Sequence, residues 1–121
     1  MMTTYVVNAF SANMVTPPVN VEFGQVGKEE FCGAIAGGIN AIGHAGTIDL
    51  INELCGTNLQ VNRAGIKAKV GDTVYIVMLT VRLEEGKVLK ADEVRRMYDD
   101  GKVVLMKAMI HNLTNKAKEG E

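Results

Sequence analysis

TVYIVMLTV, residues 73–81, is a nearly unbroken apolar run that consists mostly of β-branched and aromatic residues. Gly71 and Asp72 mark a turn at its start, and charged residues begin at Arg82. An apolar run of this length between turn and charge is typical of a strand that is buried on both faces of a sheet. We therefore predict a central strand here, and the other elements are placed around it.

Other segments have the patterns of strands that would flank the central one. Residues 3–7 (TTYVV) are β-branched and aromatic, and residues 103–110 are predicted to form a last strand. After Pro17-Pro18, which excludes helix, residues 19–23 alternate apolar with polar side chains, as in a half-buried strand near an edge. Residues 66–70 show the same alternation, with Lys67 and Lys69 at the polar positions.

Helical periodicity appears in three segments that end near glycines. They are residues 28–36, residues 48–55 and residues 92–98. With 121 residues, 47% of them hydrophobic, the chain has material for one core. We predict a single α/β domain over residues 1–121, a mixed β-sheet flanked by helices, with a polar tail at residues 111–121 that frays.

Composition removes several classes of protein and site. The uncharged amino-terminal run up to Glu22 is interrupted by polar residues, so we expect no secretion and no membrane insertion. Cys32 and Cys55 lie in apolar helical patterns, which predicts two reduced core thiols in a cytoplasmic protein rather than a disulfide. C-x-x-C and H-x-x-x-H spacings do not occur in the sequence, so we expect no metal site and no cofactor.

Charge is distributed unevenly along the chain. The net charge of −1 argues against a protein that coats duplex nucleic acid, because such binding needs many phosphate-neutralising bases. All of the 13 Lys and Arg residues except Lys28 lie after residue 62. Between residues 53 and 72 the charged residues are Arg63, Lys67 and Lys69. This pattern indicates a local anion site rather than a long basic stripe.

His44 lies in the stretch Gly43-His44-Ala45-Gly46-Thr47, at or just before the start of the second predicted helix. Glycines let a backbone approach a ligand closely, and the free N–H groups of a helix start favour an anion such as phosphate. In that interpretation His44 is a proton donor beside a phosphate. The alternative is a surface histidine in a tight turn, where the glycines are present only for their φ angles.

Arg82 and Glu85 follow the predicted central strand, at a sheet edge where sites commonly form. The guanidinium of Arg82 presents planar donors that suit a phosphate, and the alternative is an ion pair with Glu84 or Glu85. Glu85 is a candidate to hold His44 or Arg82 in place or to shuttle a proton. The alternative is a turn residue on the surface, which is the more common role of two adjacent acids before a glycine such as Gly86.

Four further polar residues are candidates for ligand contact. Asn8 and Ser11 follow the first predicted strand, in a loop position that commonly carries binding groups, although plain turn residues need no function. Thr47 is predicted to cap its helix first and to contact a ligand second. Arg63 has the simpler explanation of a solvated surface base. Motifs for acyl transfer or nucleoside triphosphate hydrolysis do not occur in the sequence.

Taken together, these residues form a pattern of blocks that resembles a known family. The blocks are N-A-F-S at 8–11, I-N-A-I-G-H at 39–44 with Thr47, L-C-G-T at 54–57, N-R at 62–63 and R-L-E-E-G-K-V-L at 82–89. The set resembles the viral anti-CRISPR ring nucleases of type III systems and their cellular and mobile-element relatives. The resemblance extends over nearly all of the chain to about residue 106.

The resemblance implies a homodimer that binds cyclic tetra-adenylate across its two-fold axis and opens the ring without metal. A substrate 2′-hydroxyl would attack the neighbouring phosphorus, which yields linear di-adenylates with 2′,3′-cyclic phosphate ends. His44 would be the general acid, Arg82 would contact the scissile phosphate and Glu85 would assist catalysis. The ligand would be lined by Asn8, Ser11, Thr47 and Arg63. Two alternatives stay open: a protein that binds the ring without cutting it, and an interaction protein with no nucleotide ligand.

Overall fold

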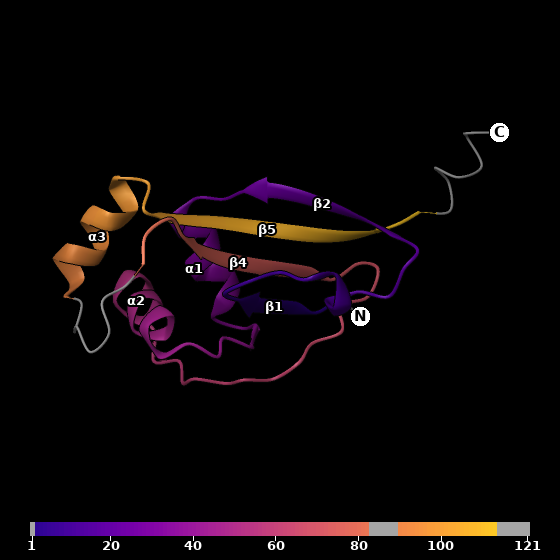
Figure 1. The fold of residues 1–121 in the computed structure, drawn as a ribbon, viewed down its shortest axis with the longest axis horizontal. Coiled ribbons are helices and arrows are strands. Elements are labelled where there is room, and N and C mark those ends of the chain that lie inside the picture. Colours follow the sequence, from indigo (N-terminus) through magenta and orange to yellow (C-terminus); the bar gives the residue numbers. More distant parts are fainter. Residues whose placement is uncertain (1, 83–89, 114–121) are drawn as a thin grey trace.

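The computed structural model describes residues 2–82 and 90–113, and its centre is a five-stranded sheet (Figure 1). The strands are β1 (Thr4–Val7), β2 (Val19–Gln25), β3 (Ile39–Asn40), β4 (Thr73–Leu79) and β5 (Val103–Asn112). Their order across the sheet is β2-β5-β4-β1-β3. The apolar run therefore forms the middle strand, with four consecutive buried residues from Val74 to Val77, as predicted. The predicted edge strand, β2, also lies at an edge.

Strand direction determines where the polar residues that follow the strands lie. β1 runs parallel to β4 and to β3, whereas β5 runs antiparallel to β4 and to β2, so the sheet is mixed. Val7 at the end of β1 pairs with Ile76 of β4. Because the two strands are parallel, their carboxyl ends meet at one edge of the sheet. Asn8 and Arg82 follow these two strands at that edge.

Three helices cover one face of the sheet and bury the larger core. They are α1 (Lys28–Ile35), α2 (Ala45–Cys55) and α3 (Ala91–Asp99), close to the predicted bounds. Phe31 of α1, Ile51 of α2 and Val94 of α3 pack with Val77 and Leu105 of the sheet. Figure 1 shows α2 and α3 beside the end of the sheet at which β4 ends. In the described part of the chain, no helix is long and apolar enough to cross a membrane.

Loops cover the opposite face of the sheet, where the sequence suggested a further strand. A short 3-10 helix, η1 (Ala12–Met14), leads into Val15, which packs with Ile66 and Ala68 on this face. Residues 66–70 have the alternation of a strand, but only Ala68 pairs, through an isolated bridge to Val15. Ile66 and Ala68 are buried under the sheet and Val70 is exposed, so this segment is a loop, and the strand-like interpretation is wrong.

The carboxyl end of the chain is ordered further than predicted. Fraying was expected from His111, whereas β5 continues to Asn112, and its residues from Met106 to Asn112 pair with β2. The Nε2 atom of His111 lies 2.9 Å from Oε1 of Glu22 on the neighbouring strand. Cross-strand hydrogen bonds and this contact stabilise His111 and Asn112, whose polar side chains had led to the prediction of a frayed tail. Residues 114–121 of the predicted tail lie outside the described residues.

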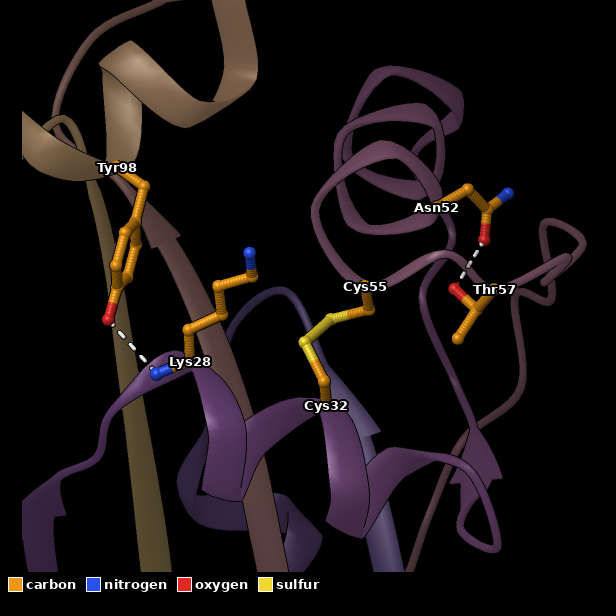
Figure 2. The surroundings of a disulfide bond; sticks show 6 residues. All are labelled: Lys28, Cys32, Asn52, Cys55, Thr57 and Tyr98. Atoms are coloured by element: carbon orange, nitrogen blue, oxygen red, sulfur yellow. Dashed lines mark hydrogen bonds between the residues drawn. A yellow bond between two sulfur atoms is a disulfide. The ribbon is translucent and has the colours of Figure 1, made fainter. Parts of the chain in front are cut away.

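The two cysteines form a disulfide, which corrects the prediction of two reduced thiols. Cys32 in α1 and Cys55 at the end of α2 lie 5.2 Å apart between Cα atoms, with an S–S distance of 2.05 Å (Figure 2). Both residues pack against the larger core cluster, so their apolar surroundings were predicted correctly. The disulfide itself was not predicted, because it depends on how α1 and α2 pack and not on the 23-residue separation along the chain.

Candidate functional site

A cleft of about 320 Å³ opens where β1 and β4 end, beside the amino terminus of α2. Its lining consists of Asn8, His44, Thr47, Val77, Leu79, Val81 and Arg82. Four residues selected from the sequence therefore share one cavity, although they lie in three separate parts of the chain. Parallel pairing of β1 with β4 brings two of them together, and the docking of α2 on the sheet supplies the other two.

His44 is the N-cap residue of α2, with φ −120° and ψ 119°. Its Nδ1 atom accepts a hydrogen bond from the backbone N–H of Thr47, with a donor–acceptor distance of 3.2 Å. A ring nitrogen that accepts must present its lone pair, so the neutral ring carries its proton on Nε2. The side chain is exposed and lines the cleft. The cap thus orients the ring and leaves an N–H donor at Nε2 for a ligand.

Thr47 has a role that differs from the predicted one. The cap of α2 is His44, and Thr47 is the residue whose N–H the cap satisfies, so the prediction of Thr47 as the cap is wrong. The Thr47 side chain is only 4% exposed. Its Oγ1 atom lies 3.3 Å from Nδ1 of His44. Thr47 is therefore part of the support for the histidine as well as part of the cleft lining.

Gly43 is required for space rather than for an unusual backbone angle. The glycines with positive φ in the described residues do not include Gly43 or Gly46, so the explanation from φ angles is wrong. A Cβ atom at Gly43 would lie 2.7 Å from Cγ of Arg63. Arg63 packs across this position and donates from Nε to the Gly43 carbonyl, 3.0 Å away. The arginine therefore buttresses the residue that precedes His44.

The remaining predicted residues are placed differently. Arg63 and Ser11 are not among the residues that line the cleft. Ser11 precedes η1 and donates from its hydroxyl to the side-chain oxygen of Asn13, so in this structure it is a turn residue. Arg82 is exposed at the cleft. Glu85, like Glu84, lies outside the described residues.

Sequence reasoning missed the apolar wall of the cleft, which consists of Val77, Leu79 and Val81. These residues belong to the run that predicted the central strand, and all three were interpreted as strand core. Their alternate spacing was the available signal, because every second residue of a strand points to the same face. Val77 also belongs to the larger core, whereas Val81, further along the same face, is 40% exposed and lines the cleft.

A second polar cluster lies outside the cleft and joins α1 to the sheet. Oε2 of Glu30 accepts from Nζ of Lys107 at 2.9 Å and from the hydroxyl of Tyr75 at 3.0 Å. These two hydrogen bonds lower the pKa of Glu30, and the one from Lys107 is the larger cause. The bond to Glu30 raises the pKa of Lys107, whereas burial is the main reason why the pKa of Tyr75 is raised. The cluster anchors α1.

Comparison with known proteins places this fold among viral proteins. A family model described as STIV B116-like matches residues 4–101, which include every lining residue of the cleft. The chain belongs to the STIV B116-like family. The structure of B116 of Sulfolobus turreted icosahedral virus is similar to it, with a TM-score of 0.82 and 40% sequence identity. That similarity covers 88% of this chain and 98% of B116.

Two further relatives of this B116-like chain come from filamentous viruses. "Uncharacterized protein ORF116" of Acidianus filamentous virus 1 is 42% identical over 115 residues, which cover 93% of this chain and 99% of the relative. "Uncharacterized protein 26" of Sulfolobus islandicus filamentous virus is 36% identical over 55 residues, 46% of this chain and 47% of that protein. These names state no activity. The viral part of the resemblance drawn from the sequence is thereby supported.

Proposed function

We propose that this protein is a metal-independent ring nuclease that cleaves cyclic tetra-adenylate and so switches off type III CRISPR signalling in the host cytoplasm. The observation that carries the proposal is the cleft, in which an imidazole with a free Nε2 side and a guanidinium line one cavity. The resemblance of the sequence blocks to ring nucleases supplies the substrate. No metal and no cofactor take part in the proposed reaction.

The proposed reaction uses a nucleophile that the substrate already carries. A ribose 2′-hydroxyl attacks the adjacent phosphorus, the new P–O2′ bond forms and the P–O5′ bond breaks. His44 gives its Nε2 proton to the departing 5′-oxygen, and the 2′-hydroxyl proton leaves to solvent, assisted by Glu85. Arg82 stabilises the negative charge that grows on the phosphate oxygens. The products are two linear di-adenylates with 2′,3′-cyclic phosphate ends.

Cleft size and lining suit one part of a symmetric ring. A volume of about 320 Å³ is at the lower end of the roughly 300–1,000 Å³ that is usual for small-molecule sites. A ring of four nucleotides is larger than that, so two clefts from two copies of the chain would share it, which is why we propose a homodimer. The apolar side chains of Val77, Leu79 and Val81 offer a wall for an adenine base, and Asn8 a polar contact.

The decisive experiment incubates purified protein with cyclic tetra-adenylate in EDTA and separates the products by chromatography and mass spectrometry. We expect complete conversion by the natural protein. His44→Ala should lower the rate roughly a hundredfold or more with ring binding largely kept, because a general acid acts in the transition state. His111→Ala is the matched control, since His111 lies on β5 beside Glu22 and does not line the cleft.

Each other outcome contradicts a defined part of the proposal. If His44→Ala converts the ring as fast as the natural protein, the general-acid role is wrong. Binding without conversion would make the protein a sequestering binder. Conversion that stops in EDTA would overturn the metal-free mechanism. Neither binding nor conversion would leave an interaction protein without a nucleotide ligand.

A further inference from the structure

Two groups of Thr47 meet the same nitrogen of the His44 ring. The backbone N lies 3.2 Å from Nδ1 and the hydroxyl Oγ1 lies 3.3 Å from it. Thr47 is in the first turn of α2 and is 4% exposed, so its hydroxyl is held by the helix and shielded from water. Capping by itself needs only the first contact, in which Nδ1 accepts from a backbone N–H of the first turn of the helix.

The two contacts serve different protonation states of the ring. When Nδ1 carries no proton, it accepts from the Thr47 amide. When Nδ1 carries a proton, the amide cannot be its partner, because both groups are then donors. A hydroxyl can donate or accept, so Oγ1 can take the hydrogen bond from Nδ1–H by rotation of its own proton. Among the hydrogen-bond partners of the His44 ring in the described residues, the Thr47 hydroxyl is therefore the one that can accept from a protonated Nδ1.

We infer that Thr47 is a positioning residue that keeps the His44 ring in one orientation through the reaction, an inference that rests on the proposed function. The acid form has protons on both nitrogens, with Nδ1–H donating to Oγ1 of Thr47. After Nε2 gives its proton to the 5′-oxygen, the neutral ring keeps the proton on Nδ1 and the same bond to Oγ1. A proton from water then returns to Nε2, and the acid is restored.

Charged groups near His44 do not replace the hydroxyl in this role. Arg82 lines the same cleft, and Arg63 binds the carbonyl of Gly43, the residue before His44. Both are cations and carry donors alone, so neither supplies the acceptor that a protonated Nδ1 needs. Among the hydrogen bonds of the described residues, those that reach the His44 ring both come from Thr47.

The test compares Thr47→Val with Thr47→Ser in cleavage and binding of cyclic tetra-adenylate. Valine has nearly the shape of threonine and keeps the amide, but it lacks the oxygen. We expect Thr47→Val to lower kcat roughly tenfold, the loss of one hydrogen bond to a charged group, with the Kd for the ring unchanged. The alkaline limb of its rate profile should move to lower pH. Thr47→Ser should restore both, and Thr47→Ala replaces valine if the valine variant does not fold.

A second readout needs no activity and uses nitrogen NMR of the imidazoles in the protein alone. The chain has two histidines, so His44→Ala assigns the signals and His111 is an internal control. In Thr47→Val we expect the neutral ring of His44 to keep its proton on Nε2, through the amide. Its titration should move to lower pH, while that of His111 stays in place.

The two readouts separate failure of the inference from failure of the proposed function. If Thr47→Val matches the natural protein in rate profile and titration, the positioning role is wrong while the nuclease proposal stands. A weaker Kd with an unchanged profile would make Thr47 a ligand contact instead and would also overturn the inference. If the natural protein does not cleave the ring, the proposed function is wrong. If the NMR titration of His44 is then also the same in Thr47→Val as in the natural protein, the inference is wrong as well.

Discussion

The two ends of α2 are built in opposite ways. At the carboxyl end, Cys55 is bonded to Cys32. Gly56, which has a left-handed φ of 67°, donates its N–H to the carbonyl of Asn52. At the amino end, His44 is exposed, and the hydrogen bonds of the described residues that reach its ring both come from Thr47. One end of the helix is fastened to the rest of the fold, and the other presents a titratable ring to a cleft.

This contrast indicates how a small domain can hold an exposed histidine in place. Sites carried on rigid elements are positioned more accurately than sites on loops. Leu50 and Ile51 of α2 are fully buried in the larger core, so the helix is also fixed along its length. Changes at the carboxyl end should therefore lower stability, whereas changes at the amino end should lower activity. The predictions that follow test this division of roles.

The largest expected effect is at the disulfide. Replacing both cysteines, Cys32→Ser with Cys55→Ser, releases a constraint on a 23-residue loop of the unfolded chain. The chain-entropy estimate for such a loop is about 3 kcal/mol, which should lower Tm by roughly 10 °C or more. Thermal and urea unfolding measure this, and the natural protein in excess reductant should behave like the variant.

Activity of the same double variant tests the contrast itself. Well below its Tm, it should cleave cyclic tetra-adenylate at nearly the natural rate, because the His44 cap is 11 residues away along α2. A variant that is fully folded but has lost most of its activity would show that the disulfide positions His44, and the separation of roles would be wrong.

The next largest effect is expected at Asn52, which joins the end of α2 to the loop that follows. Its Oδ1 accepts from Oγ1 of Thr57 and from the N–H of Leu59, each at 2.8 Å, and its Nδ2 donates to the Leu59 carbonyl (Figure 2 shows the Thr57 bond). Asn52→Ala leaves these part-buried groups without partners, which should cost about 2 kcal/mol of unfolding free energy.

Urea unfolding of Asn52→Ala measures this cost against Glu53→Ala. Glu53 is the exposed neighbour on the same helix, so its replacement controls for helix propensity and should change stability by less than about 0.5 kcal/mol. Equal stability of the two variants would mean that the Asn52 hydrogen bonds contribute little and that the carboxyl end is held mainly by the disulfide.

Local patterns of the sequence were sufficient for much of this architecture. The run at residues 73–81 identified the middle strand because burial on both faces leaves an unbroken apolar signal. The start of a helix next to His44 was also predicted, because the apolar residues from Ile48 to Cys55 have helical spacing. A histidine at a helix start and an arginine at a strand end both suit a phosphate, so His44 and Arg82 were assigned to one site. The cleft that they share depends on the direction of β4 and on the docking of α2 against the sheet.

What could not be predicted depends on how distant segments pack. The partner of Cys32 is set by the docking of two helices, and the space needed at Gly43 is set by Arg63, 20 residues further along. Nothing in the local sequence distinguishes a glycine that is needed for φ from one that is needed for space. The alternation at residues 66–70 led to a wrong prediction of a strand, because a loop that packs on one side can have the same period as a strand.

The smallest expected effect, at Gly43, tests the amino end of the comparison. Gly43→Ala places a methyl group 2.7 Å from Cγ of Arg63, so the arginine must rotate away and give up its 3.0 Å bond to the Gly43 carbonyl. Because Arg63 is exposed and can move, the cost to stability should be only about 1 kcal/mol. Cleavage should suffer more, since the residue before the His44 cap is displaced.

A double-mutant cycle isolates this contact. Arg63→Ala removes the Cγ atom that the new methyl group would meet, so Gly43→Ala should cost less stability in the Arg63→Ala background than in the natural protein. Urea unfolding of the four proteins gives the coupling free energy, which we expect to be about 0.5 kcal/mol or more. Strictly additive effects would mean that Arg63 does not press on Gly43. The His44 ring would then be positioned by Thr47 without support from Arg63, and the contrast between the two ends of α2 would be sharper still.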